Sequence, residues 1–236
     1  QVLNSISSVS VKKFQPPSRR SSALENPKPV PVTAQVVSRS GARTVGFEID
    51  ENHFANLMKA DIKDAVYTAS ACANFQEQYR AEDVQGADTS VTAVSGLSAL
   101  VGVTEENITF ENGYDLSFLE SVEPLCVVSQ SYAAQYGLNV DDMLSMPFYV
   151  TRYNDDGFSL RYEHLGMQDV KIIGVYADSA SGSSVPCSMI VSVPWLQTVV
   201  KENNLRFYYS SFRCALRDPM KLNDFKDAMR SAQRNE

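Results

Sequence analysis

The chain has 236 residues, of which 44% are hydrophobic and 10% aromatic, so it can bury one large core or two smaller ones. Its formal net charge is −7, with 28 acidic and 21 basic residues, which argues against a nucleic-acid partner because such a partner needs a basic face. No apolar run approaches the roughly 20 residues that cross a bilayer, so we expect a soluble protein or a soluble piece of a larger one.

The first 44 residues differ from the rest and are expected to form an arm. Five prolines fall between Gln15 and Pro31, with Arg19 and Arg20 among them. Proline removes a backbone donor and fixes φ, so residues 1–44 are predicted to be an extended linker rather than a packed element. We interpret the two arginines as solvated; contact with a lipid or a partner is the alternative.

Regular structure is predicted to start near residue 45 with alternating strands and a helix. Asp50 is the expected N-cap of the helix, and Phe54, Leu57 and Met58 share one of its faces. Gly86 and Asp88 punctuate the chain before the last strand of this group. The predicted elements are a strand at 45–49, a helix at 51–60 and strands at 65–73 and 89–94.

The middle of the chain is predicted to be richer in strands. Ser129 is the expected cap of a short helix that stops at Gly137. Alternating residues on both sides of a turn at 154–157 indicate a hairpin, and a third strand extends it into a meander. Pro147, at the start of the first hairpin strand, favours an edge position. The predicted elements are a strand at 125–128, a helix at 130–136 and strands at 147–153, 158–162 and 170–176.

The last part of the chain returns to strand–helix units. Pro194 opens one helix and Asp218–Pro219 starts another, whose buried stripe carries Leu222, Phe225 and Met229. The predicted elements are a strand at 188–193, a helix at 194–202, a strand at 207–216 and the final helix. The fold class is therefore α+β: a split α/β subdomain at 45–122 and 186–236, with an inserted β-rich subdomain at 123–185.

Groups that work as acids, bases or nucleophiles near neutral pH are scarce. The two histidines, His53 and His164, have no second histidine at ligand spacing, and both are interpreted as surface or structural residues. No G-x-S-x-G, P-loop or G-x-G-x-x-G motif occurs. Ser10 and Lys13 match S-x-x-K, but they lie in the predicted arm, where no rigid frame holds a nucleophile.

Three further features are weighed as binding motifs. The serine-rich loop around Gly182 has no helix start that would aim amides at a phosphate. Asp141–Asp142 and Asp155–Asp156–Gly157 lack the alternating ligands of a calcium loop, so turn chemistry explains them better. The sequence therefore predicts no catalytic residue, no cofactor site and no metal site, and the chain is expected not to be an enzyme.

Aromatic residues and cysteines are assigned mainly to the core. Strand alternation puts Tyr208 and Tyr209 on opposite faces, so we favour packing over a binding groove lined by 207–209. Trp195, the only tryptophan, is interpreted as a packing anchor. The four cysteines lack C-x-x-C spacing, and buried free thiols are favoured over two disulfides. They are Cys72, Cys126, Cys187 and Cys214.

Several segments, in order, resemble the periplasmic core domain of MacB/FtsX-like ABC-transporter permeases. Ile108 to Asp115 is similar to the opening motif of that domain. Glu123 to Ala134 resembles its strand and helix, and Lys171 to Asp178 matches its V-I-G-V-x-x-D strand. Later parts, from Ile190 to Pro194 and from Asp218 to Met229, look like its closing units. The sequence departs from the pattern before Tyr114, where the arginine is absent, at Met143 to Met146, and in the proline-rich arm.

The resemblance implies an extracytoplasmic domain of a bacterial permease, inserted between transmembrane helices, with a porter-like α/β subdomain and a small β-rich one. It further implies coupling to a separate or fused cytoplasmic ATPase, contact with a peptide or protein outside the membrane, and a homodimer in the full transporter. Relatives of this kind serve peptide or antibiotic efflux, lipoprotein release or regulation of cell-wall hydrolases. The alternative is a free-standing secreted binding protein or adhesin. A hydrolase ranks third, because nothing in the sequence indicates convergent titratable groups.

Overall fold

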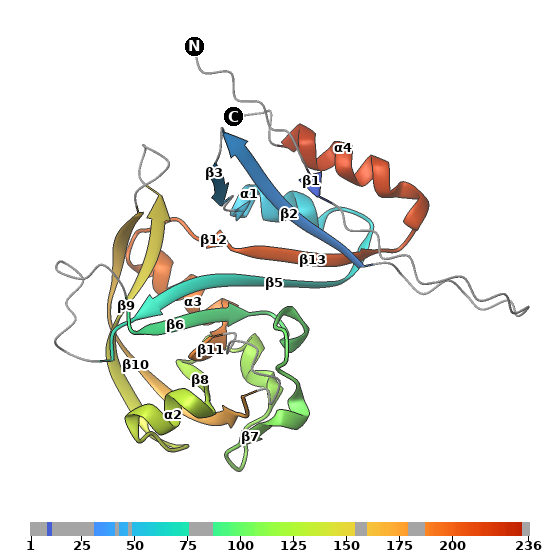
Figure 1. Cartoon of the computed structure of the whole chain (residues 1–236). Coiled ribbons are helices and arrows are strands. Elements are labelled where there is room, and N and C mark those ends of the chain that lie inside the picture. The colour runs from blue at the N-terminus through green and yellow to red at the C-terminus, as the bar shows by residue number, and fades with distance from the viewer. Residues whose placement is uncertain are drawn as a thin grey trace, which may run out of the picture. The chain divides into compact units, whose positions relative to one another are not determined.

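The computed structural model describes residues 9–10, 31–40, 43–46, 49–75, 87–153, 160–178 and 187–232. The chain divides into two compact units. Unit 1 consists of Gln1–Val66 and Tyr209–Glu236, and unit 2 of Tyr67–Tyr208. The chain therefore leaves unit 1 once, builds all of unit 2, and returns to unit 1. Helix and strand are mixed throughout (Figure 1), as the predicted α+β class requires.

The strands of unit 1 bring the two ends of the sequence together. β2 (Pro31–Ser40) is antiparallel to β13 (Ser211–Leu216) and to β3 (Arg43–Gly46), and it also pairs with β1 (Val9–Ser10). β4 (Ile49–Asp50) pairs with β12 (Tyr208–Tyr209), at the residue where unit 1 resumes. Residues 31–40 are thus a paired strand where the sequence predicted an extended arm. The prolines end at Pro31, and the β-branched residues that follow favour a strand.

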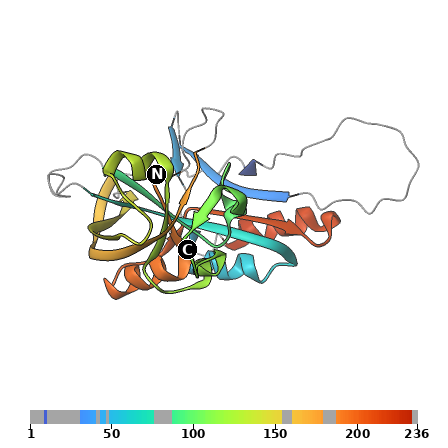
Figure 2. The same cartoon turned by 90° about the horizontal axis from the view of Figure 1, so that it is seen from below.

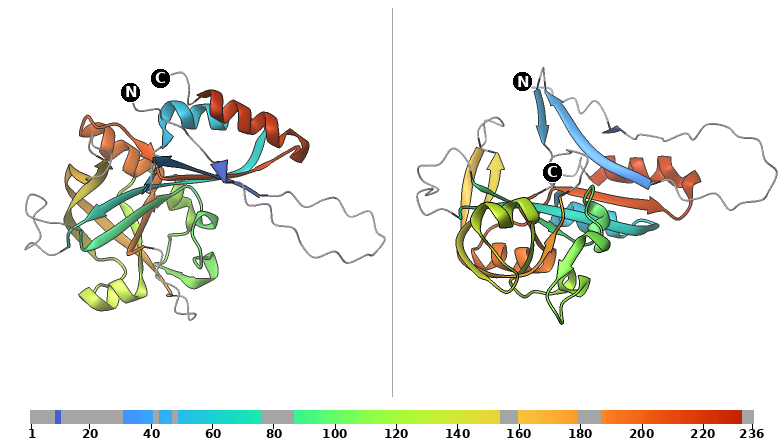
Figure 3. Two further views of the ribbon diagram at one scale, coloured as in Figure 1. Left: turned by 45° about the horizontal axis from the view of Figure 1, so that its top comes forward. Right: turned by 60° about the horizontal axis from the view of Figure 1, so that its bottom comes forward.

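Two helices complete unit 1. α1 (Glu51–Met58) begins at the predicted N-cap Asp50, whose side chain accepts from the His53 amide, and it packs against α4 (Leu222–Ala232). Figure 3 (left) shows both helices on the same face of the strands of unit 1. On α1 only Leu57 is buried, whereas Met58 is 46% exposed, so the predicted apolar face is narrower than expected. Met58 is the last residue of the helix. A short 3-10 turn, η4 (Pro219–Lys221), precedes α4.

Six strands of unit 2 close into a ring. Each strand pairs with two neighbours, and β9 closes the circuit because it pairs with β10 along most of its length and with β5 at Tyr149 and Phe148. In circular order the strands are β5 (Ile62–Ala73), β6 (Thr89–Val94), β11 (Met189–Ser192), β8 (Leu125–Ser129), β10 (Leu160–Tyr176) and β9 (Met143–Tyr153). β5 starts in unit 1 and continues into the ring.

The ring is a mixed sheet. β8 is parallel to β10 but antiparallel to β11, and β11 is parallel to β6. The end of β8 and the end of β10 therefore meet the starts of β6 and β11 at one end of the ring. Every residue of β8 and β11 is buried, so both faces of the sheet are covered at these two strands.

β10 is one strand of 17 residues and not two members of a meander (Figures 1 and 2, yellow to orange). The predicted break before residue 170 is instead a bulge, where the register with β9 shifts between His164 and Met167. Gly166 sits in this bulge with φ +75°, a backbone conformation that side chains disfavour. Pro147 is likewise not at an edge, because β9 has β10 on one side and β5 on the other, and the Pro147 carbonyl accepts from the Asn74 amide.

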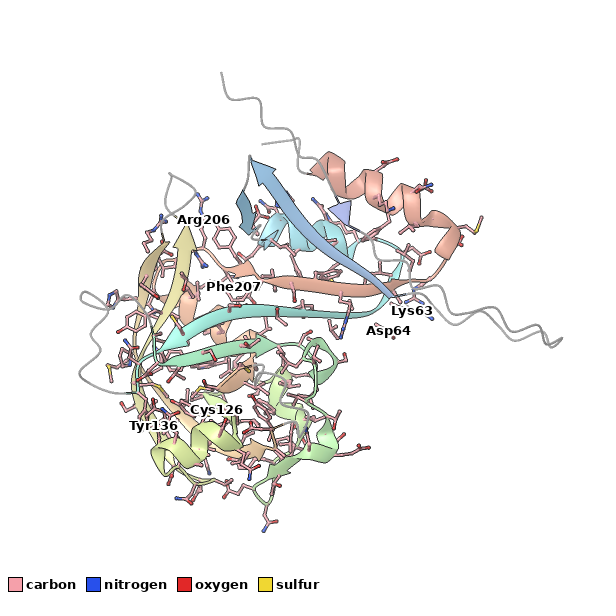
Figure 4. All side chains as sticks on the ribbon, in the orientation of Figure 1. Lys63, Asp64, Cys126, Tyr136, Arg206 and Phe207 are labelled. Atoms are coloured by element: carbon pink, nitrogen blue, oxygen red, sulfur yellow. The ribbon has the colours of Figure 1, made fainter. Side chains whose placement is uncertain are left out.

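Helix α3 packs against several strands of the ring. α3 (Val193–Glu202) is capped by Ser192, with the predicted proline in its first turn. It packs against β6 and β11, while its Trp195 meets Phe148 of β9 edge to face with centroids 5.5 Å apart. Contacts to strands on both sides of the ring, and a Trp195 side chain only 4% exposed, confirm the packing role predicted for the tryptophan. Figure 4 shows the side chains that fill this unit, with Cys126 labelled on β8.

Residues 97–122 form an outer layer that the sequence did not resolve into elements. Its inward side chains join one core cluster with β8, β10 and β11, to which Val103, Ile108 and Phe118 contribute. The layer consists of η1 (Leu97–Ala99), η2 (Glu105–Asn107), β7 (Ile108–Phe110) and η3 (Leu116–Glu120). Figure 1 shows it in green beside the ring, with β7 labelled.

The short local elements follow the sequence most closely. β6 and α2 (Gln130–Tyr136) have the predicted bounds, and α2 has the predicted cap Ser129 and end at Gly137. The segment 123–185, predicted as a separate insert, lies within unit 2 together with most of 67–122. The three-part division of the chain into 1–44, 45–122 with 186–236, and 123–185 stays a prediction.

Candidate functional site

The motif from Lys171 to Asp178 lies on the last part of β10, at the end of the ring where β8 also ends. The tightest backbone contact in this region is between β10 at Gly174 and β7. A Cβ at this position would lie 3.1 Å from the Thr109 carbonyl oxygen and 3.2 Å from the Phe110 ring. A side chain at this position would crowd β7, which pairs with the strand in antiparallel register, Gly174 opposite Phe110.

Asp178, the last residue of the motif, holds the first turn of α2. Its Oδ2 accepts a 2.9 Å hydrogen bond from the Ser131 amide, and the Ser129 hydroxyl accepts one from the Tyr132 amide at 3.1 Å. Two of the amides that a helix start leaves unsatisfied therefore find side-chain acceptors. Asp178 therefore links the end of β10 to the start of α2 through a hydrogen bond.

Tyr176 links the same strand to the residues before β11. Its hydroxyl donates to the Cys187 carbonyl, just before β11 begins. The Tyr176 side chain is buried, and burial raises the pKa of its hydroxyl, so the hydroxyl remains a neutral donor. β10 is thus tied to α2 by Asp178 and to the start of β11 by Tyr176.

A small polar depression of about 120 Å³ opens at this end of the ring. It is lined by groups from the starts of β6 and β11, the end of β8 and the helix α2, which are Asp88, Ser90, Ser129, Ser131, Tyr132, Gln135, Cys187 and Ser188. Several of these groups bond one another: the Ser90 and Ser188 hydroxyls lie 3.2 Å apart, and so do the Ser129 and Ser131 hydroxyls, while the Tyr132 hydroxyl lies 2.8 Å from that of neighbouring Thr89. The depression is therefore a preorganised set of hydroxyl groups.

The chemistry available in this depression is hydrogen bonding. Burial raises the pKa of the Cys187 thiol and of the Tyr132 hydroxyl, so both stay protonated at neutral pH. Asp88 accepts from the Phe75 amide and from the Thr89 hydroxyl at 2.8 and 2.7 Å. These groups can hold a small polar ligand, and none of the bonds described here activates a nucleophile.

The two histidines belong to different units, and neither lines this depression. His53 is in the first turn of α1 in unit 1, with its Nδ1 2.9 Å from Asp50 Oδ1. Burial opposes ionisation of Asp50, but the hydrogen bonds and charge of His53 outweigh it and lower the pKa of the carboxyl. His164 is an exposed residue of β10 whose ring lies 4.7 Å from that of Tyr149. Both have the structural settings that the sequence predicted.

Tyr208 and Tyr209 have different contact partners, as strand alternation predicted. Tyr208 lies under the guanidinium of Arg152, 4.7 Å from ring centroid to Cζ. Tyr209 instead stacks on Phe54 of α1 with centroids 3.9 Å apart. Phe207 is only 3% exposed. Figure 4 labels Arg206 and Phe207 at this return of the chain.

All four cysteines are free, as favoured from the sequence. Cys126, Cys187 and Cys214 are buried, and Cys72 is half-buried with its thiol 3.7 Å from the Tyr149 carbonyl oxygen. Burial raises the pKa of every one, for Cys214 to about 11. The thiols are therefore protonated packing groups.

The Asp141–Asp142 pair serves a turn, as predicted. Asp141 has φ +79°, and the Asp142 carboxylate accepts from the Asn139 amide at 2.7 Å. Asp141 also lies 2.5 Å from the ammonium of Lys171, whose pKa is raised by that hydrogen bond. The remaining sequence candidates, Arg19 and Arg20, the S-x-x-K lysine, the loop around Gly182 and the turn 155–157, lie outside the described residues.

Two properties of the described part of the chain bear on function. It contains no group of three or more His, Cys, Asp or Glu side chains placed to hold a metal ion. None of its helices is long and apolar enough to span a membrane. The sequence signals that could have located the depression are Ser129 at the end of a buried strand, Ser131 just after it, and Ser188 just before another buried strand.

No protein-family model matches the sequence, and no curated protein matches it. Among solved structures, the chain is similar to the extracellular domain of the noncanonical ABC-type transporter YknZ from Gram-positive bacteria, with 17% identity, a TM-score of 0.47, and coverage of 80% of this chain and 84% of that one. It is also similar to a domain of a protein described as a permease from Porphyromonas gingivalis, with 16% identity, a TM-score of 0.41, and coverage of 81% and 73%.

A third similar structure is the periplasmic region of MacB from Actinobacillus actinomycetemcomitans, with 10% identity, a TM-score of 0.43, and coverage of 81% of this chain and 76% of that one. These identities and TM-scores are too low to transfer a function, which is therefore argued below from this chain's own residues. At this level, the chain is similar to extracytoplasmic domains of ABC-transporter permeases, the class that its sequence motifs resemble.

Proposed function

We propose that this chain is the extracytoplasmic domain of an ABC-transporter permease, which handles a substrate or partner outside the membrane and changes conformation with ATP hydrolysis on a cytoplasmic subunit. The observation that carries the proposal is the path of the chain. The segments before Val66 and after Tyr209 both belong to unit 1, where β2 pairs with β13 and α1 packs against α4. A domain inserted between two membrane helices needs this arrangement, because both of its ends return to one membrane.

The motif residues support the same proposal. Gly174, Tyr176 and Asp178 tie β10 to β7, β11 and α2, so the resemblance falls on residues that hold the ring of unit 2 together. In this proposal unit 2 is a rigid body, and motion takes place where the chain crosses between units. Unit 1 corresponds to the membrane-proximal part and has no catalytic role.

We further propose that the chain catalyses no reaction itself. Support comes from the groups at the depression, whose thiol and phenol are held protonated, and from the positions of His53 and His164 away from it. The alternative function is a free-standing secreted binding protein or adhesin. The depression at the end of the ring fits that alternative equally well, so the location of the chain decides between them.

Labelling of intact cells that express the full gene product tests the proposal. A Cys72→Ser background removes the one cysteine that is not buried, and Val101→Cys, at a side chain that is 85% exposed, supplies a reporter. We expect a membrane-impermeant maleimide to label the reporter on whole cells, with the protein in the membrane fraction. Labelling only after permeabilisation would contradict an extracytoplasmic location. Release of labelled protein into the medium would favour the adhesin or binding protein.

Transport coupling needs a second measurement. With the full permease and its ATPase reconstituted in nanodiscs, we expect a disulfide that joins the two units to lower the ATPase rate, and reduction to restore it. A matched pair of cysteines placed within unit 2 is the control. An ATPase rate that is indifferent to the cross-link would contradict coupling, whatever the labelling result.

A further inference from the structure

The polar depression at the end of the ring offers more hydrogen-bond acceptors than donors. A hydroxyl group has one proton and two lone pairs, so hydroxyls that bond one another keep spare lone pairs. One bond joins the Ser90 and Ser188 hydroxyls over 3.2 Å, and another joins the Ser129 and Ser131 hydroxyls. Ser90 Oγ and Ser129 Oγ each accept one backbone amide as well. After these bonds each pair still has more lone pairs than protons, so a ligand at this wall has to bring donors.

Asp88 adds a group that only accepts. It receives hydrogen bonds from the Phe75 amide and the Thr89 hydroxyl at 2.8 and 2.7 Å. Both donors are neutral, so these two bonds orient the carboxylate and do not cancel its charge. Because Thr89 gives its only hydroxyl proton to Asp88, the Tyr132 hydroxyl, 2.8 Å away, donates to Thr89. The phenol proton is therefore also used within the chain.

A second carboxylate lies beside the same wall. Asp178 Oδ2 accepts from the amide of Ser131, a residue that lines the depression, at 2.9 Å. Asp178 Oδ1 is buried and has no hydrogen-bond partner among the residues that the structure describes. A buried carboxylate oxygen is costly to leave without a donor. Its negative charge adds to that of Asp88 at this end of the ring.

Positive groups are scarce around the depression. No lysine or arginine occurs from Ala87 to Thr151, the stretch that supplies β6, β8 and α2. On β10, Lys171 is opposite Leu125, at the other end of β8 from Ser129, and its ammonium lies 2.5 Å from Asp141. An anionic ligand therefore meets no positive side chain among the described lining residues, and the two carboxylates repel it.

We propose that the depression binds a primary ammonium group on a short alkyl chain. The three N–H donors of the ammonium would bond to the Asp88 carboxylate, to oxygens of the Ser90–Ser188 pair and to the side-chain oxygen of Gln135, all of which line the depression. Its volume of about 120 Å³ suits a headgroup of a few heavy atoms, since one water molecule takes about 30 Å³ of the liquid. The inference goes beyond the proposed function and holds equally for a permease domain and for a free-standing binding protein.

NMR titrations of the isotope-labelled 236-residue chain test the site. The probes are ethylammonium chloride, tetramethylammonium chloride and sodium acetate, compared at equal ionic strength. We expect ethylammonium to shift the Ser131 and Ser188 amide signals saturably, with a Kd of about 1 mM or weaker because the ligand is so small. Tetramethylammonium has the charge but no N–H donor, so it should bind at least about tenfold more weakly. Acetate should leave these signals unshifted.

Matched variants locate the site. Asp88→Asn keeps the acceptor oxygen but removes the charge, and it should weaken ethylammonium binding by about tenfold. Asp169→Asn removes the same charge at an exposed residue of β10 and should change the Kd by less than about twofold. Ser90→Ala with Ser188→Ala removes the hydroxyl pair at constant charge and should weaken binding by about fivefold. Thermal melts followed by Trp195 fluorescence check that each variant is folded.

A capped lysine separates two sources of the ammonium group. Nα-acetyl-lysine methylamide carries the group on a side chain, as a protein partner does, whereas ethylammonium carries it as a small molecule. Tighter binding of the capped lysine would assign the site to a partner's lysine side chain, and tighter binding of ethylammonium would assign it to a small amine. Either result supports the ammonium site.

Three outcomes would overturn the inference: no saturable shift with either primary ammonium probe, equal binding of tetramethylammonium, or equal losses in Asp88→Asn and Asp169→Asn. If Asp88→Asn fails to fold, the serine pair decides, and unchanged ethylammonium binding in that variant would overturn the inference. The membrane labelling described above is independent of these results. A chain that binds ethylammonium here but is not extracytoplasmic would refute the proposed function and leave the ammonium site intact.

Discussion

Gly174 shows how a single residue sets the distance between two strands. Replacement by alanine places a methyl group 3.1 Å from the Thr109 carbonyl oxygen and 3.2 Å from the Phe110 ring, closer than side chains normally approach. We expect Gly174→Ala to lower the free energy of unfolding of unit 2 by about 1–3 kcal/mol, because β7 must move outward. Urea unfolding followed by Trp195 fluorescence measures this change in the free energy of unfolding.

The control is to make Gly174→Ala in a Phe110→Ala variant and compare its cost with that in the wild type. With the ring removed, β7 can approach differently, and the cost of Gly174→Ala should fall. An alanine at 174 that costs the same in both backgrounds would show that the strain is elsewhere.

Arg152 is a nearly buried cation, 8% exposed, with three kinds of partner. Its Nη2 donates to the Arg206 carbonyl at 3.0 Å, its Nε lies 3.5 Å from Glu163 Oε2, and its plane covers the Tyr208 ring. Arg152→Met should cost about 2–4 kcal/mol and Arg152→Lys about 1–2 kcal/mol, because lysine keeps the charge but not the planar fork.

Arg161→Met is the control for Arg152. Arg161 pairs with the same glutamate at 3.0 Å, but its side chain is 48% exposed, so its loss should cost less than about 1 kcal/mol. Equal costs at the two arginines, measured by the same urea unfolding, would contradict the special role of the buried one.

Asp50 gives unit 1 a dependence on pH. Its folded-state pKa is lowered, so the stability that it contributes is present above the unfolded value of about 3.9 and is lost as the pH falls through the folded value. Asp50→Asn keeps an acceptor for the His53 amide but does not titrate. Circular dichroism melts at about pH 6 and about pH 3 should show a larger loss for wild type than for this variant; equal losses would assign the pH dependence to other groups.

At the scale of elements, α2 illustrates a helix held by tertiary contacts. Seven residues are too few for a stable isolated helix, and its first amides depend on Ser129 and on Asp178 from β10. We expect Asp178→Ala to speed hydrogen exchange of the α2 amides by about fivefold or more, which corresponds to a lost cap of about 1 kcal/mol.

Asp169→Ala is the control for the α2 prediction. Asp169 is exposed on the same strand and should leave exchange in α2 unchanged. Unchanged exchange in Asp178→Ala would mean that Ser129 alone suffices to start the helix.

The elements differ in how far the sequence predicts them. α2 and β6 have the predicted bounds because capping residues and strand alternation act within a few positions. β10 was divided wrongly, since a glycine and polar residues near 166 look the same in a sequence whether they form a turn or a bulge. The layer 97–122 was missed because 3-10 turns and a three-residue strand have no period to detect.

At the scale of the whole molecule, unit 2 is closed on itself by the pairing of β9 with β5. A fragment of residues 67–208 retains residues 67–73 of β5, the other five ring strands and α3. We expect it to fold by itself, with Trp195 fluorescence as in the whole chain, because its core is internal to the unit. An emission spectrum like that in urea would show that unit 2 needs unit 1 to fold.

The sequence by itself determined the class of the fold, the cap and bounds of α2 and the proline in the first turn of α3; it favoured free cysteines and contains no recognisable catalytic motif. These depend on composition and on contacts between near neighbours in the chain. Only the tertiary structure decided that β2 pairs with β13, that six strands close into a ring, and that Asp178 after β10 caps the first turn of α2. Such features join residues far apart in sequence, and strand pairing and burial, which have no local signature, select them.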